Sequence, residues 1–177
     1  MQTLCRQTKF NSKQQNKMKK EIIITRVINA PIELVWKTFT DPEFVKRWWG
    51  PDNFTCPSAK IDFIEGGTSL VCMRATKEFG GQDMYNIWTY SKIILNERIE
   101  YIQNLSDENG NVVDPINLGM PADFPKDTET IVILKNIGGG KIELIFKEFA
   151  DFGQMFGAAK LGLEQCIEKM LIIFTTS

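Results

Sequence analysis

The stretch FGQMFGAAKLGLEQCIEKMLIIF, residues 152–174, decides the fold of this chain. Its apolar residues recur every three or four positions, which is the spacing of one face of an α-helix. The stripe consists of Phe152, Met155, Phe156, Ala159, Leu163, Ile167, Met170, Leu171 and Phe174. Gly153, Gly157 and Gly162 lower the intrinsic helix propensity, so packing against other elements must hold this helix. We expect a terminal helix from about Asp151 to Phe174.

The residues before this helix are typical of strands. Between Glu21 and Phe149, β-branched and alternating runs are separated by turn signals. Lys60–Ile64 alternates and is expected to be one strand, followed by a tight turn at Gly66-Gly67. We expect about six antiparallel strands, two short helices between Pro31 and Trp48, and a long surface loop over Ser106–Asp127. The simplest way to bury the terminal stripe is an α+β helix-grip fold, in which a curved antiparallel sheet wraps around the long C-terminal helix.

Charge is distributed unevenly along the 177 residues. Residues 1–20 contain six basic side chains and no acidic one, whereas the remaining residues carry a net charge of −7. The basic segment holds too little apolar surface to order itself, so residues 1–20 are predicted to be a disordered leader. Residues 21–177 are predicted to form a single domain. Because this domain is acidic, we expect no nucleic-acid partner.

Composition also excludes several classes of site. The chain has no histidine, which removes the commonest general base and metal ligand. Its four cysteines are far apart and form no CxxC pair, so we expect free thiols, no metal site and no cofactor. No apolar run approaches the ~20 residues that cross a bilayer, and the N-terminus lacks the apolar segment of a secretory signal. We therefore expect a cytoplasmic protein without membrane insertion.

Several short motifs resemble a known superfamily. They are the segment Arg26–Pro31 followed by Val35-Trp36, the run Trp48-Trp49-Gly50-Pro51, the turn Glu65-Gly66-Gly67, and the segment from Met84-Tyr85 through Ile94–Ile99. In this order and spacing they resemble the SRPBCC (START/birch-pollen-allergen-like) superfamily, and within it the family homologous to the activator of the heat-shock protein 90 ATPase. The resemblance covers about residues 21–174 and implies the helix-grip fold. One departure is Gly162-Leu163, where the family usually has Gly-Trp.

The aromatic content indicates a binding pocket. Four tryptophans and twelve phenylalanines are present, and two of the tryptophans are consecutive and cannot both face one core. Alternation along the strand from Met84 places Asn86, Trp88 and Tyr90 on one face, where the amide and the phenol could orient a ligand. The predicted ligand-binding residues are Trp48, Trp49, Asn86, Trp88, Tyr90, Phe156 and Met170. Met73 and Met155 are candidates for further lining. The alternative for most of these side chains is an ordinary packed core.

Three functions fit this pattern. The first is non-enzymatic binding of a hydrophobic small molecule in a cavity between the sheet and the C-terminal helix. The second, implied only by the family resemblance, is an interaction domain whose partner is a chaperone. The third is an enzyme of the cyclase or dehydratase type that uses the same cavity. No acid–base pair is visible, so no catalytic residue is assigned and binding without turnover is the expectation. The scaffold alone does not decide among the three.

Overall fold

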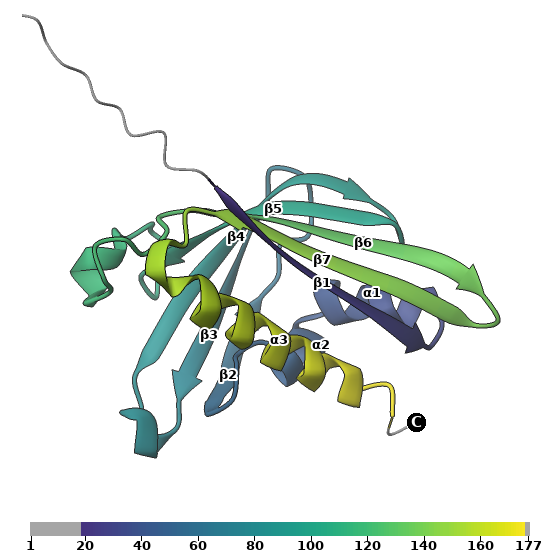
Figure 1. Cartoon of the computed structure of the whole chain (residues 1–177), viewed down its shortest axis with the longest axis horizontal. Helices are drawn as coiled ribbons and strands as arrows, with labels where there is room; N and C mark the ends of the chain where they lie inside the picture. Colours follow the sequence, from purple (N-terminus) through teal and green to yellow (C-terminus); the bar gives the residue numbers. More distant parts are fainter. Residues whose placement is uncertain (1–18, 176–177) are drawn as a thin grey trace, which may run out of the picture.

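The structure, a computed structural model, describes residues 19–175. The predicted disorder of the leader falls almost entirely on residues outside this range. The described part forms one seven-stranded antiparallel sheet in the order β1-β7-β6-β5-β4-β3-β2. The strands are β1 Lys20–Asn29, β2 Phe54–Lys60, β3 Thr68–Ala75, β4 Asp83–Ile94, β5 Arg98–Ser106, β6 Thr128–Gly138 and β7 Lys141–Ala150. The sheet curves around the helix α3, Phe156–Ile172, which confirms the predicted helix-grip architecture (Figure 1).

The prediction of about six strands missed one. Residues 54–60 form β2, whereas the predicted strand Lys60–Ile64 is wrong, because only Lys60 belongs to a strand. Pro57 weakens the strand signal in the sequence of β2, since proline cannot donate a hydrogen bond to a neighbouring strand. The structure tolerates it because β2 lies at the edge of the sheet and has a register irregularity between Thr55 and Ser58.

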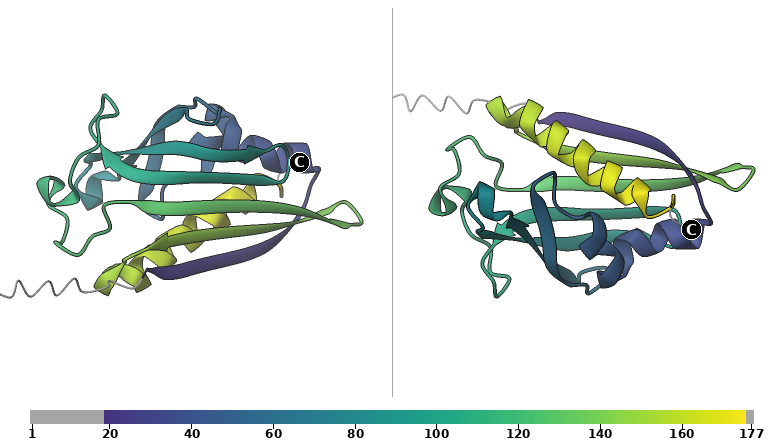
Figure 2. Two further views of the ribbon diagram at one scale, coloured as in Figure 1. Left: turned by 90° about the horizontal axis from the view of Figure 1, so that it is seen from above. Right: turned by 90° about the horizontal axis from the view of Figure 1, so that it is seen from below.

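Two short helices follow β1, as predicted. They are α1, Ile32–Thr40, and α2, Pro42–Trp48. The Asp41 carboxylate caps α2 by accepting a hydrogen bond from the backbone N–H of Glu43 at 2.9 Å. The indole Nε1 of Trp48 donates to the backbone oxygen of Thr38 at 2.6 Å and so fixes α2 against α1. In Figure 2 the two helices lie beside the C-terminal half of α3.

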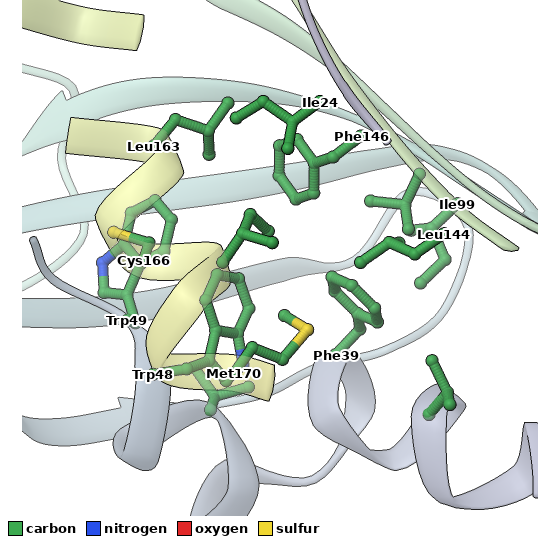
Figure 3. Packing of buried hydrophobic residues seen from close by; sticks show 14 of the residues in the cluster. Ile24, Phe39, Trp48, Trp49, Ile99, Leu144, Phe146, Leu163, Cys166 and Met170 are labelled. Atoms are coloured by element: carbon green, nitrogen blue, oxygen red, sulfur yellow. The ribbon is translucent and has the colours of Figure 1, made fainter. Parts of the chain in front are cut away.

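The terminal helix begins later than its apolar pattern predicts. Gly153 has a φ of +48°, so the backbone cannot continue as a right-handed helix from Asp151. A short 3₁₀ turn, Gly153–Met155, precedes α3 instead. The buried residues of α3 are Leu163, Cys166, Ile167 and Met170. Figure 3 shows Leu163, Cys166 and Met170 in the core together with Phe146 of the sheet and with Trp48 and Trp49 at the end of α2. The expectation that the two tryptophans cannot both face one core is wrong, because both are buried in it.

Candidate functional site

A cavity of about 270 Å³ lies between the first half of α3 and the inner face of the sheet. Helix α3 contributes Ala159, Gly162, Leu163 and Cys166 to its wall. The sheet contributes residues from the ends of β3 to β7 that lie under this part of the helix. Phe124 and Pro125, from the long connection between β5 and β6, also line it. Figure 1 shows this connection beside the N-terminal end of α3.

Most of the lining is apolar. The side chains that surround the space are mainly methionine, phenylalanine, leucine, alanine and proline: Met73, Met84, Leu105, Phe124, Pro125, Phe152, Met155, Ala158, Ala159 and Leu163. Methionines adapt their shape easily, because the thioether chain has three rotatable bonds. Such a lining favours an apolar ligand body and can fit more than one shape.

Besides Asn104 of β5, four polar side chains of the sheet line the cavity. Asn86 of β4, Gln103 of β5, Thr128 of β6 and Glu148 of β7 come from four adjacent strands. The register places Gln103 directly opposite Thr128. The buried Nδ2 of Asn86 and the buried Oε1 of Gln103 have no hydrogen-bond partner in the described part of the chain. Buried polar atoms are normally paired, so unpaired ones facing a cavity are available to a ligand.

Glu148 is the charged group of this polar set. It lies on the inner face of β7 with 8% of its surface exposed, in line with the apolar Leu144 and Phe146. Within residues 19–175 its carboxyl has neither a hydrogen bond nor an ion pair. Burial raises the pKa of Glu148 to about 7, because a low-dielectric environment disfavours the ionised form.

Two further ionisable groups lie near Glu148. The phenol of Tyr101 on β5 is buried, and burial, followed by the charge of Glu148, raises its pKa well above the ordinary value. The Cys166 thiol lines the cavity from α3, and burial raises its pKa to about 12. Both groups therefore stay neutral at physiological pH, and neither provides Glu148 with a countercharge.

The segment after α2 closes one side of the cavity with Trp49 and Pro51. Lys169 of α3 holds this segment: its Nζ donates to the backbone oxygens of Gly50 and Pro51 at 2.8 Å each, and to that of Phe54 at 2.9 Å. Gly50 has a φ of +112°, which residues other than glycine rarely adopt. The Trp49 Nε1 is buried and has no hydrogen-bond partner among the described residues.

Comparison with known proteins identifies the family. The model of the family described as Activator of Hsp90 ATPase homolog 1-like protein matches residues 29–174. The chain belongs to this family. The resemblance inferred from Trp48–Pro51 and the other motifs is thereby confirmed.

Solved structures agree with the fold of this family member. A protein from Chromobacterium violaceum superimposes with a TM-score of 0.70 at 22% identity, over 87% of this chain and 96% of that one. A protein from Arthrobacter aurescens superimposes with a TM-score of 0.71 at 19% identity, over 89% of this chain and 87% of that one. A protein from Rhizobium leguminosarum superimposes with a TM-score of 0.67 at 21% identity, over 90% of this chain and 96% of that one. At these identities the likeness establishes the fold alone. No curated protein matches the chain.

The structure brings two of the seven predicted binding residues of this family member to the cavity, Trp49 and Asn86. Met73 and Met155, the additional candidates, also line it. Leu163 lines the cavity as well and is 6% exposed.

The other five predicted residues lie elsewhere. Trp88 packs behind Trp49, with the ring centroids 4.8 Å apart, and the Tyr90 hydroxyl is 2.9 Å from the Ser69 hydroxyl in the core. Trp48 and Met170 are fully buried, and Phe156 packs on Phe152 outside the lining. Alternation placed Trp88 and Tyr90 on the correct face of β4. However, they lie further along the strand, where the interior is filled by the rings of Phe63 and Tyr101.

The sequence interpretation missed Gln103, Thr128 and Glu148. For Glu148 a signal was present, because the inner face of β7 reads Ile, Leu, Phe, Glu, Ala at alternate positions. A carboxylate in such a row is a candidate for function. Among residues 19–175, no cluster of three or more Cys, Asp or Glu is placed to hold a metal ion. In the same range, no helix combines the length and apolarity that crossing a membrane requires.

Proposed function

We propose that this protein binds an apolar small molecule in the cavity between α3 and the sheet and does not turn it over. The observation that carries the proposal is the cavity itself: about 270 Å³ of space, apolar walls and a few polar groups gathered on one side. Sites for small molecules are typically concave, mostly apolar, and oriented by a small number of polar side chains. The volume is near the lower end for such sites, which suits a compact ligand.

The ionisable groups in the cavity support binding rather than turnover. Glu148 and Cys166 are the ionisable side chains of the described lining, and the thiol is held protonated by a pKa of about 12. General acid–base catalysis needs groups whose protonation states are complementary and that reach the reacting atoms. A single carboxyl without a second titrating partner serves better to orient a ligand. The free thiols of Cys56, Cys72 and Cys166 also support a reducing, cytoplasmic location.

A neutral fluorescent probe tests the proposal. N-phenyl-1-naphthylamine should bind the wild-type protein saturably, with a blue-shifted emission. Ala159→Phe places an aromatic ring in the cavity and should weaken this binding at least about tenfold without lowering the melting temperature. The control is Leu161→Phe on the 55% exposed side of the same helix, where affinity should change less than about twofold.

Failure has a clear meaning. A wild-type protein that gives no saturable probe signal, or an Ala159→Phe variant that binds as well as the wild type, would overturn the proposal. The family description refers to an activator of the Hsp90 ATPase, and an interaction with a chaperone would then be the leading alternative.

A further inference from the structure

The polar side of the cavity contains more hydrogen-bonding capacity than the protein satisfies. The Glu148 carboxyl and the Gln103 Oε1 can both accept, and neither has a partner within residues 19–175. The Asn86 Nδ2 and the Trp49 Nε1 can both donate and are likewise unpaired in that range. Leaving such groups buried and unpaired costs stability, and a ligand that pairs with them recovers it. The two acceptors lie on β5 and β7, on either side of β6. The register places Gln103 opposite Thr128 and Glu148 opposite Thr130, so the two side chains are offset diagonally across β6.

Charge distinguishes among the possible partners for Glu148. Among the described residues that line the cavity there is no lysine or arginine. Lys20, on the inner face of β1, lies with its Nζ over the Phe156 ring, 5.3 Å from the centroid. Lys169 of α3 is occupied by three backbone carbonyls. Tyr101 and Cys166, which face Glu148 from β5 and α3, are neutral. The carboxylate therefore lacks a countercharge that the described protein could provide.

We infer that the ligand is an amine carried on an apolar body, with its ammonium group donating hydrogen bonds to the Glu148 carboxylate and the Gln103 Oε1. This inference rests on the proposed function and names the chemical class of the ligand. The ammonium provides the missing countercharge inside a low-dielectric site, where a charge-assisted hydrogen bond is strong. The Asn86 amide remains available to an oxygen acceptor on the same molecule. Carboxylate ligands are disfavoured, because they would place a second negative charge beside Glu148.

The inference also fixes a dependence on pH. With a pKa of about 7, Glu148 in the empty protein is protonated below neutral pH and ionised above it. Binding of an ammonium below pH 7 must first displace this proton, so its affinity falls by up to about tenfold for each pH unit below 7 and levels off above. The affinity for a carboxylate ligand has the opposite dependence on pH, and the affinity for a neutral alcohol changes little with pH.

Three ligands with the same eight-carbon chain separate these cases: octylammonium, 1-octanol and octanoate. Their own charges stay nearly constant between about pH 6 and about pH 8.5. Affinities come from isothermal titration calorimetry or from displacement of N-phenyl-1-naphthylamine. The variant is Glu148→Gln, which keeps the side-chain shape and removes the charge. The matched control is Glu143→Gln, the same change on the outer face of β7, where Glu143 lies 3.7 Å from Lys135.

We expect octylammonium to bind the wild type most tightly near about pH 8, and Glu148→Gln to weaken it at least about tenfold while leaving 1-octanol and the control unchanged. If 1-octanol binds but octylammonium binds no better, or if Glu148→Gln leaves the affinity for octylammonium intact, the amine inference is overturned and the proposed function stands. Tighter binding of octanoate would overturn it in the same way. If neither the probe nor any of the three ligands binds, the proposed function fails as well.

Discussion

At the scale of single residues, Glu148 is a destabilising group in the empty protein. Its pKa in the fold, about 7, lies above the ordinary value of 4.5. Between these two pH values the folded state holds a proton that the unfolded state has released, so stability falls as pH rises through this window. Above about pH 7 both states are ionised and the full cost of burying the charge is present. Below about pH 4.5 both are protonated and the cost disappears.

The first prediction follows from this loss of stability with rising pH. Glu148→Gln should raise the free energy of unfolding near about pH 8 by on the order of 2 kcal/mol, because it removes a buried charge that has no partner among residues 19–175. The gain should shrink steadily toward about pH 5. Urea denaturation at several pH values measures it, with Glu143→Gln as the control. If the Glu148→Gln protein is less stable than the wild type at alkaline pH, the carboxylate has a favourable partner in the fold.

At the scale of elements, Lys169 connects α3 to the segment that follows α2. Its ammonium donates hydrogen bonds to the backbone oxygens of Gly50, Pro51 and Phe54. It thus provides a partner for three carbonyls that secondary structure does not pair. Gln165, one turn earlier, adds a contact, because its Oε1 accepts from the backbone N–H of Asp52 at 3.2 Å. Together these contacts hold the Trp49 side of the cavity in place.

The second prediction concerns this connection. Lys169→Met keeps the length of the aliphatic side chain but leaves three carbonyl oxygens without their charged donor, so it should cost about 2–3 kcal/mol of stability. Amides of residues 49–54 should also exchange faster with deuterium. Lys160→Met is the control, since Lys160 lies on the same helix and its Nζ is 3.9 Å from the Glu164 carboxylate, a weak surface ion pair. Equal stability losses in the two variants would argue against a special role for Lys169.

Particular elements show how far the sequence alone could lead. The period of the terminal stripe predicted α3 and the burial of Leu163, because helical spacing is a local property. The strand alternation likewise put Asn86, Trp88 and Tyr90 on the inner face of β4. It could not tell which of them borders empty space, since that depends on the side chains that neighbouring strands and α3 bring to each position. Trp49 packs on Trp88, whereas Asn86 borders the cavity.

At the scale of the whole molecule, the cavity lies under a cover made from distant parts of the chain. The connection between β5 and β6 brings Phe124 and Pro125 to the lining. It is attached near the start of α3, where the backbone N–H of Gln154 donates to the Asp123 carboxylate at 3.2 Å. Asn104 adds a second attachment by donating from its Nδ2 to the backbone oxygen of Lys126 at 3.0 Å. A ligand that enters from this side passes between the connection and α3.

The last prediction tests whether this cover controls access. Asp123→Ala removes the attachment to Gln154 without changing a lining residue, so it should lower the barrier to opening more than it changes the bound state. In stopped-flow measurements with N-phenyl-1-naphthylamine, the association and dissociation rates should both rise about threefold or more, while their ratio stays within about twofold. Asp127→Ala, an exposed carboxylate at the end of the same connection, should leave both rates unchanged. If Asp123→Ala changes only the dissociation rate, Asp123 stabilises the bound complex and does not control access. If it changes neither rate, the ligand enters by another side of the cavity, and the segment around Trp49 and Pro51 becomes the next place to test.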